Sequence, residues 1–388
     1  MSCVLNRNTQ KLSRREFLAG SAMATVPGLS VVLKAKQAVT KNAEKHPSVQ
    51  TVLGPVPGEE LGVTLTHEHA PAVDWSELYA TSPAPIGSLV KKMLAHTVKI
   101  LNEFSQSLAE LEGPGAIVEC TPIRVGRYPE LLVDLAHRTK VHVIASTGFW
   151  CEAMAPQHPW AVRMGIEQGG AEKMAELFVQ EITEGMEDPH GGWGAKFTKI
   201  RAGAIKIGTS QLLRPSERVV HVAAALASRE TGCPITTHTT NGGGLEQARL
   251  LLESGANPER VIIGHLGHKD DRENDEANDY HTMIAKLGCY LQFDRVGSEN
   301  YDCNKQARQL RNLIAAGFLH QILVSHDNVP FFYREYAELQ KPTNGWKKNR
   351  SDNTIVTTKL VASLKQLGVS AEEIRTILVE NPCRVLAF

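Results

Sequence analysis

Residues 204–238 read AIKIGTSQLLRPSERVVHVAAALASRETGCPITTH and contain one complete strand–helix–strand unit. The apolar run Ala204–Ile207 is followed by a helix-like stretch at Glu217–Glu230, then by Gly232 and by a second apolar run, Ile235–His238. A glycine just after a helical stretch is the usual left-handed stop of a helix. Short apolar runs without polar alternation are typical of parallel strands that are buried on both faces. The unit therefore predicts two parallel strands joined by a helix.

The same unit recurs along the chain, with further helix-like segments at Leu245–Glu253 and Lys305–Ala315. We expect eight strands, at Gly62–Thr66, Ala116–Thr121, Val141–Thr147, Ala204–Ile207, Ile235–His238, Val261–His265, Cys289–Asp294 and Gln321–Ser325. Eight strands alternating with helices predict an α/β fold, a (β/α)8 TIM barrel that forms a single domain. A doubly wound open sheet is the alternative. Its dinucleotide-binding form has no support, because no G-x-G-x-x-G motif follows the first strand.

Composition agrees with a globular enzyme-sized domain. Of 388 residues, 42% are hydrophobic and 22% are charged, which is enough apolar material for a large core. The 42 Lys and Arg residues balance the 42 Asp and Glu residues. We therefore expect no nucleic-acid partner, since such proteins normally carry a basic excess. The seven cysteines form no C-x-x-C pair, so neither a zinc ribbon nor a redox dithiol is indicated.

The first forty residues are predicted to form a targeting signal rather than a folded domain. The hexapeptide SRREFL at 13–18 precedes an apolar run, Phe17–Leu33, that is too short and too interrupted for a comfortable membrane span. It resembles the bacterial twin-arginine signal, which implies export of the folded protein to the periplasm or beyond. An amphipathic N-terminal helix is the alternative. Since no other stretch approaches eighteen apolar residues, we expect no stable membrane span in the mature protein.

Polar residues close seven of the eight predicted strands, and the fourth strand carries Lys206. In such a barrel the active site lies at the carboxyl ends of the strands. These residues are His67-Glu68-His69, Glu119-Cys120-Thr121, Ser146-Thr147-Gly148, Lys206, His238, His265, Asp294-Arg295 and Ser325-His326-Asp327. A lone buried histidine is more often a hydrogen-bonded core residue than a ligand. The barrel, however, brings all of these strand ends to one place. Their conjunction predicts a metal site.

The spacing of these residues suits two divalent ions. His67 and His69 stand two apart on a strand, so their side chains project to the same side. Neutral imidazoles are good ligands for Zn²⁺ and similar ions, and Asp327 can supply an anionic oxygen to the same ion. His238 and His265, on adjacent strands, can hold a second ion.

Lys206 lies between the two groups in an apolar strand. An ammonium cannot bind a metal, but burial and nearby cations favour the neutral amine. A neutral amine can add CO₂ to become a carbamate, whose two oxygens can bridge two ions that are ~3.5–4 Å apart. A hydroxide bridging such ions is a nucleophile near neutral pH, because metal binding lowers the pKa of water to ~7.

Taken together, these stretches resemble the phosphotriesterase-like family of the amidohydrolase superfamily. The matching motifs are Gly54-Pro55, Glu59-Glu60-Leu61-Gly62, Thr66-His67-Glu68-His69, Ala204-Ile205-Lys206-Ile207-Gly208, Thr237-His238-Thr239, Gly264-His265-Leu266-Gly267, Ser325-His326-Asp327 and Glu380-Asn381-Pro382. The resemblance covers Val49 to Phe388 and implies a binuclear centre, usually of Zn²⁺, with Fe, Co or Mn as other candidates. A homodimer is also compatible with it.

The resemblance assigns roles to the six residues. It implies that His67, His69 and Asp327 hold the more buried ion. His238 and His265 hold the more exposed ion, and a carboxylated Lys206 bridges the two.

The expected activity is hydrolysis of a small-molecule lactone, carboxylic ester or phosphotriester by the metal-bridging hydroxide, with Asp327 accepting the proton. Asp294 and Arg295 are further candidate catalytic residues, because Asp294-Arg295-Val296-Gly297 is similar to the lactonase-like branch. Two positions depart from that branch: Trp150 replaces a common tyrosine, and His268 replaces a common aspartate. The alternatives are a mononuclear amide hydrolase or deaminase and a non-catalytic metal-binding relative.

Aromatic residues near the strand ends predict the walls of the substrate pocket. They are Trp150, Phe331, Phe332 and Tyr333.

Overall fold

The computed structural model describes most of the chain from residue 47 to residue 388. The described ranges are 47–70, 72–73, 86–108, 111, 113–123, 125–150, 167, 169–189, 196–210, 213–240, 242–267, 279–298, 302–330, 332–333 and 352–388. The expected export signal at 1–40 lies outside them. So do Phe331 and His268, and only the backbone of Phe332 and Tyr333 is described.

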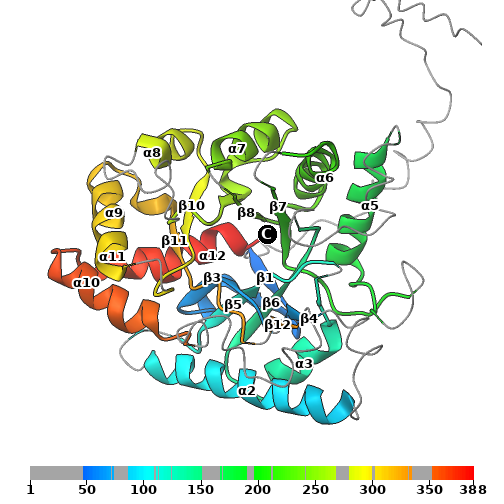
Figure 1. Cartoon of the computed structure of the whole chain (residues 1–388), viewed down its shortest axis with the longest axis horizontal. Coiled ribbons are helices and arrows are strands. Elements are labelled where there is room, and N and C mark those ends of the chain that lie inside the picture. The colour runs from blue at the N-terminus through cyan, green and yellow to red at the C-terminus, as the bar shows by residue number, and fades with distance from the viewer. Residues whose placement is uncertain are drawn as a thin grey trace, which may run out of the picture. The chain divides into compact units, whose positions relative to one another are not determined.

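Eight parallel strands form one sheet, which runs in the order β11-β10-β9-β8-β7-β6-β5-β3 (Figure 1). They are β3 (Thr64–Glu68), β5 (Ala116–Glu119), β6 (His142–Thr147), β7 (Ala204–Gly208), β8 (Ile235–His238), β9 (Val261–Ile263), β10 (Tyr290–Phe293) and β11 (Ile322–Val324). All eight predicted strands are confirmed, although the first begins and ends two residues later than expected. The (β/α)8 barrel is confirmed with them.

Backbone hydrogen bonds join the first and last strands and close the barrel. The Asp327 amide donates to the His67 carbonyl over 3.0 Å, and the His69 amide donates to the Asn328 carbonyl over 2.9 Å. These residues lie just beyond the regular part of β11 and at the end of β3. The closing seam therefore passes directly through three of the predicted site residues.

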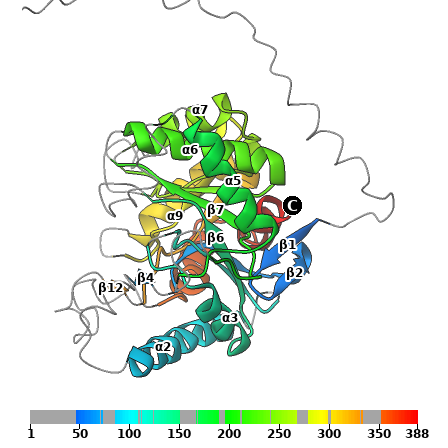
Figure 2. The same ribbon diagram turned by 90° about the vertical axis from the view of Figure 1, so that its right-hand side faces the viewer.

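Helices surround the strands as the alternating pattern predicts (Figures 1 and 2). They are α2 (Ile86–Ser107), α3 (Pro129–His137), α5 (Gly170–Thr183), α6 (Pro215–Thr231), α7 (Gly244–Glu253), α8 (Asp279–Ala285), α9 (Cys303–Ala315), α10 (Val361–Gln366), α11 (Ala371–Arg375) and α12 (Asn381–Leu386). Five-residue π-helical turns at Val356–Leu360 and Thr376–Glu380 precede α10 and α12. The three helix-like segments named from the sequence all fall within α6, α7 and α9.

The strand–helix–strand unit at residues 204–238 shows why α6 begins at Pro215 and ends at Thr231. Pro215 occupies the first helical position, where its missing N–H is not needed. The Glu217 carboxylate accepts a hydrogen bond from the Arg214 amide at 2.9 Å and so satisfies a donor at the helix start. At the other end Gly232 adopts φ 79°, which favours glycine because it has no Cβ.

The apolar core has two parts. Inward-facing strand residues fill the barrel, among them Ala116, Val118, Ile144, Ala204, Ile262 and Leu323. Val49 of β1 (Ser48–Thr51) and Val385 of α12 belong to the same cluster, so these elements seal one end of the barrel. Outward-facing strand residues pack against the surrounding helices in a larger cluster.

Two short two-stranded sheets lie at opposite ends of the barrel (Figure 2). β1 pairs with β2 (Gly54–Pro57) at the sealed end, near the C-terminus. At the other end β4 (Ala72–Val73) pairs in parallel with β12 (Phe332–Tyr333). Since β4 follows His69 and β12 follows Asp327 closely in sequence, this pair marks the end that carries the predicted site.

A bulge in β3 separates the directions of neighbouring side chains. Leu65 pairs with Ile117, but Glu68 pairs with Glu119, so β3 contains one extra residue over this interval. Bulges of this kind re-aim side chains and are common near functional sites. Here Thr66 and His67 both contact Gln292 inside the barrel, whereas Glu68 points away from it.

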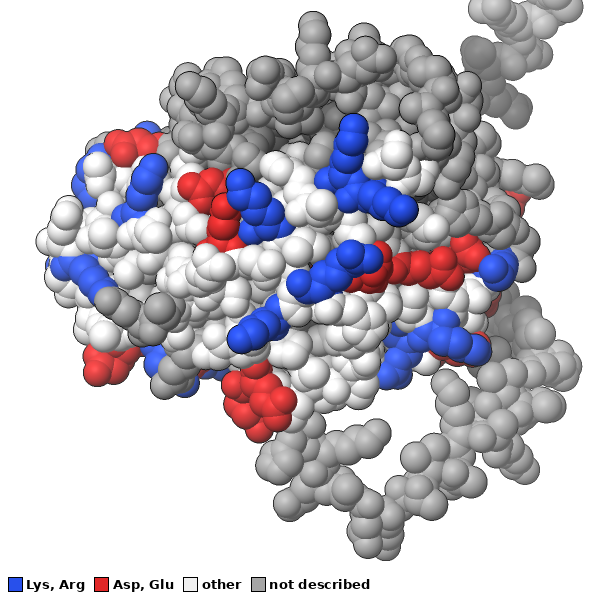
Figure 3. Space-filling view, turned by 90° about the horizontal axis from the view of Figure 1, so that it is seen from below, with Lys and Arg blue, Asp and Glu red and all other residues white. Residues whose placement is uncertain are grey.

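The surface carries charges of both signs. On the face shown in Figure 3, Lys and Arg side chains are interspersed with Asp and Glu side chains among the described residues. This agrees with the zero formal net charge of the chain. No helix within the described ranges is both long and apolar enough to span a bilayer.

A buried ion pair away from the barrel interior gives a test of the packing. Arg127 donates to both carboxylate oxygens of Glu181 in α5, at 2.5 and 2.6 Å, and both side chains are almost fully buried. Removing one partner leaves a buried charge uncompensated, which typically costs about 3–5 kcal/mol. We predict that Glu181→Gln lowers the free energy of unfolding by about 3 kcal/mol, measured by urea denaturation. A loss below about 1 kcal/mol would contradict this role for the pair.

Candidate metal centre

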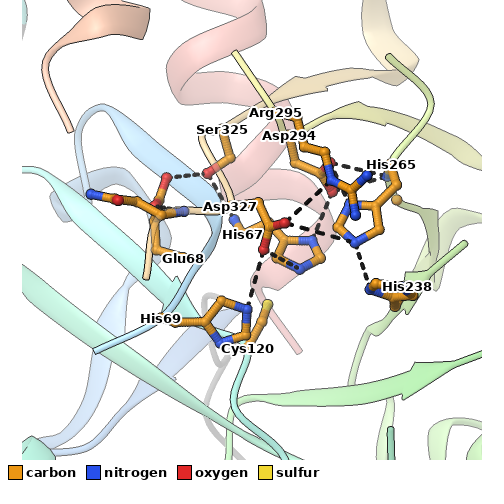
Figure 4. A network of polar contacts seen from close by, with 12 residues as sticks. His67, Glu68, His69, Cys120, His238, His265, Asp294, Arg295, Ser325 and Asp327 are labelled. Atoms are coloured by element: carbon orange, nitrogen blue, oxygen red, sulfur yellow. Dashed lines mark hydrogen bonds and ion pairs between the residues drawn. The ribbon is translucent and has the colours of Figure 1, made fainter. Parts of the chain in front are cut away.

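The residues predicted from the strand ends converge in one buried cluster (Figure 4). His67 and His69 from β3 and the adjoining residue face Asp327, which follows β11. His69 Nε2 lies 3.2 Å from Asp327 Oδ1, and His67 Nε2 lies 3.8 Å from the same oxygen. Each of these three side chains offers one ligand atom, and the three atoms lie close enough together to surround a single ion.

Lys206 enters the cluster from β7. Its Nζ lies 2.5 Å from His67 Nε2, and the residue is only 1% exposed. On β7 the neighbours Ile205 and Ile207 face the helices, so strand alternation turns Lys206 into the barrel. A lysine is rarely buried to this degree without a partner.

His238 and His265 form the second part of the cluster. His265 Nε2 lies 2.7 Å from His238 Nδ1 and 4.0 Å from Asp327 Oδ2. Burial, together with the neighbouring His265, holds the pKa of His238 well below its ordinary value. Burial and Arg295 lower the pKa of His265 to about 3. Both rings are therefore neutral near pH 7, which is the state that binds metals.

Asp294 lies behind two of these imidazoles. Its Oδ1 lies 2.7 Å from His265 Nδ1, and its Oδ2 lies 2.8 Å from His67 Nδ1. The His265 amide also donates to both oxygens. Burial acts to raise the pKa of Asp294, but His265 and His67 hold it below its ordinary value. The single carboxylate thus orients one ring from each half of the cluster.

Asp327 and Arg295 are in contact at the edge of the cluster. Arg295 Nε donates to Asp327 Oδ2 over 3.3 Å. Burial acts to raise the pKa of Asp327, but His265 and His69 hold it well below its ordinary value. Asp327 has φ 53° and His265 has φ 60°, in the left-handed region that residues with a Cβ rarely adopt. Such conformations persist only where the surroundings fix them, and they are often found at functional sites.

Further contacts at the cluster are not evident from the sequence. Gln292 accepts a hydrogen bond from Thr236 at 3.3 Å and donates to Thr66, and its Oε1 lies 3.0 Å from His67 Nδ1. It lies on β10, two residues before Asp294, which follows the strand directly. The period of two would have placed both side chains inside the barrel.

His69 has its own outer contact. Its Nδ1 lies 2.8 Å from Thr121 Oγ1, and Thr121 donates to the Glu119 carboxylate. Burial raises the pKa of Glu119 to about 7, although the hydrogen bond from Thr121 opposes this. Outer contacts of this kind fix the orientation and tautomer of histidine ligands.

Of the predicted pocket residues, Trp150 can be placed. Its ring centroid lies 5.2 Å from that of His238, with the planes at 81°. Trp150 therefore forms an aromatic wall beside the second part of the cluster. Phe331 is outside the described residues, and the backbone of Phe332 and Tyr333 lies in β12 at the same end of the barrel.

The donor set fits divalent transition-metal ions. If His265 donates from Nδ1 to the Asp294 carboxylate, its Nε2 presents a lone pair to the cluster. The same reasoning applies to His67, whose Nδ1 faces Asp294 and Gln292. Imidazole nitrogens with a carboxylate on the opposite ring nitrogen are the usual arrangement of protein zinc ligands. The described His and Asp groups could thus hold metal.

Comparison with known proteins identifies relatives along nearly the whole described part of the chain. A sequence model of the phosphotriesterase family matches residues 47–386. A phosphotriesterase homology protein of Mycobacterium tuberculosis is 30% identical over 349 residues, which cover 87% of this chain and 97% of that protein. An N-acetyltaurine hydrolase of Rattus norvegicus is 31% identical over 376 residues, which cover 88% of this chain and 98% of that protein.

Solved structures agree as well. The organophosphorus hydrolase of Deinococcus radiodurans superposes with a TM-score of 0.72 at 26% identity, over 90% of this chain and 100% of that one. An organophosphate hydrolase engineered from a weak promiscuous lactonase template gives a TM-score of 0.72 at 27% identity, over 88% of this chain. The chain therefore belongs to the phosphotriesterase family of metal-dependent hydrolases.

Proposed function

We propose that this chain is a binuclear metal hydrolase that cleaves a lactone, carboxylic ester or phosphotriester. The observation that carries the proposal is the convergence of two candidate ligand groups on Asp327, whose Oδ1 lies 3.2 Å from His69 Nε2 and whose Oδ2 lies 4.0 Å from His265 Nε2. Lys206 lies beside the first group, with its Nζ 2.5 Å from His67 Nε2. His67, His69 and Asp327 supply one group, and His238 and His265 supply the other. Zn²⁺ is the ion we expect, since four imidazoles and a carboxylate suit it.

Each residue of the proposed centre would have a distinct role in the reaction. Two bound divalent ions would supply Lewis acidity and a water that is deprotonated near neutral pH. Lys206, as its carbamate, would bridge the two ligand groups and reduce their positive charge. Asp327 lies between the groups and would accept the proton released in the reaction, while Arg295 contacts its second oxygen.

We assign Asp294 to positioning rather than to proton transfer. Both of its oxygens face imidazoles, and the side chain is fully buried behind them. Trp150, beside His238, would contact an apolar part of the substrate.

An N-acyl amide is the second candidate substrate class. Curated relatives of 30–31% identity are named N-acetyltaurine hydrolases. The same proposed metal centre could hydrolyse an amide, whose nitrogen leaving group needs protonation more than an alkoxide does. Arg295, whose side chain is 14% exposed at the edge of the cluster, could pair with an anionic substrate group.

The substrate class is tested with a panel assayed on zinc-loaded protein. It should contain a lactone, an aryl carboxylic ester, a phosphotriester and N-acetyltaurine. We predict a higher kcat/KM for the lactone or the carboxylic ester than for N-acetyltaurine, because an oxygen leaving group departs more readily than an amide nitrogen and both esters suit an apolar wall. A clear preference for N-acetyltaurine would establish the second candidate instead.

The bridging role of Lys206 is tested by metal content. We predict about two ions per chain in the purified protein by elemental analysis, and fewer than one in Lys206→Ala. Lys206→Glu should recover most of the loss, because its carboxylate resembles a carbamate. ¹³C-bicarbonate should label the protein in an NMR spectrum, and the signal should vanish in Lys206→Ala. One ion per chain that is insensitive to Lys206→Ala would favour a mononuclear site.

The positioning role of Asp294 is tested with Asp294→Asn. An amide offers one acceptor oxygen and cannot serve both imidazoles, so we predict that both ions bind about 10–100-fold more weakly. Competition with a coloured chelator measures this directly. Unchanged metal affinity together with lost turnover would show that Asp294 instead acts as an acid or base in the reaction.

A further inference from the structure

Glu68 is a fully buried carboxylate that points away from the cluster although it lies between two of its histidines (Figure 4). It accepts four hydrogen bonds, all from the segment that follows β11. Ser325 Oγ donates at 2.7 Å, and the His326 amide, the His326 Nδ1 and the Asn328 amide each donate at 2.9 Å. One side chain of β3 thus collects the donors on both sides of Asp327.

The conformation of Asp327 explains this geometry. A residue with positive φ between two ordinary residues turns the flanking amides toward the same side and forms an anion-binding concavity. Here the amides belong to His326 and Asn328, and the anion is the Glu68 carboxylate. The left-handed conformation is unfavourable for a residue with a Cβ, so these bonds hold Asp327 in a state it would otherwise leave.

His326 extends the connection beyond the barrel. Its Nδ1 donates to Glu68, and its Nε2 accepts a hydrogen bond from the Val356 amide at 3.0 Å. A neutral imidazole satisfies both contacts in a single tautomer. Val356 begins the π-helical turn Val356–Leu360 ahead of α10, so the C-terminal helices support the backbone on which Asp327 lies.

We propose that Glu68 is a positioning residue that sets Asp327 for metal binding through His326 and Asn328. The proposal rests on the two-ion centre proposed above. It concerns the half of that centre to which Asp327 belongs, together with His67 and His69. Within the part of the chain that the structure describes, the hydrogen bonds to the Glu68 side chain all come from the segment 325–328, whereas His238 and His265 are held by other residues. Loss of the Glu68 carboxylate should therefore weaken one ion more than the other.

The test is a zinc titration of Glu68→Gln, with chelator competition to resolve the two affinities. Gln offers one acceptor oxygen and an NH₂ group that opposes the facing donors. We predict that one ion binds about 10–100-fold more weakly and that the second changes by less than about threefold. Glu181→Gln is the matched control, since it also removes a fully buried carboxylate that accepts several hydrogen bonds. That carboxylate lies on α5 and its donors are Arg127 and the Glu187 amide. The control variant should lose stability and keep both zinc affinities.

A second pair of variants separates positioning from general loosening of the fold. His326→Gln can still donate at one end and accept at the other, so it should retain most of the affinity. His326→Phe can do neither and should weaken the same ion as Glu68→Gln.

The outcomes separate the two proposals. Wild-type protein that binds fewer than two zinc ions would refute the binuclear centre itself. If the wild-type protein binds two ions, equal weakening of both ions in Glu68→Gln would overturn the positioning role. Two unchanged affinities would overturn it as well.

Discussion

The barrel of this protein closes through the same residues that build its candidate metal centre. Between β3 and β11 the backbone hydrogen bonds join His67 and His69 to Asp327 and Asn328, in place of a long regular ladder. Any change in how the barrel closes would therefore also move the candidate metal ligands. The Glu68 carboxylate sits on the outer side of this seam and bonds to the residues around Asp327. Strand closure and site assembly depend on one small set of hydrogen bonds.

The positions of the candidate metal ligands follow well from the sequence. Parallel strands leave the barrel at a common end, so a histidine, lysine or aspartate at the end of a strand must approach its counterparts. This reasoning places His67, His69, Lys206, His238, His265 and Asp327 in one cluster, and the structure brings them together. It needs only the strand register, which the apolar runs indicate to within two residues.

The supporting contacts could not be read in the same way. The sequence shows that Asp294 and Arg295 stand together at a strand end, but not that the first turns behind His67 and His265 while the second reaches Asp327. The direction in which the Glu68 side chain points is not evident from the sequence for a related reason. A strict period of two across 64–69 takes no account of the bulge in β3, which alters which side chains share a face. The contact between His326 and Val356 depends on how a distant turn packs.

The interior of the barrel explains how so many polar groups are tolerated at once. Its sealed end is apolar, with residues such as Ile144, Ile262 and Leu323. Above these lies an uncharged polar layer, in which Gln292 bonds to Thr66 and Thr236. Only then come the imidazoles, Lys206 and the carboxylates. Buried charge is costly unless it is paired and hydrogen-bonded. The amide of Gln292 meets this condition without adding charge, because it satisfies two threonines and His67 simultaneously. A leucine at this position would leave the Thr66 and Thr236 hydroxyls without these bonds, so the polar layer is what connects an ordinary hydrophobic core to the buried cluster of candidate metal ligands.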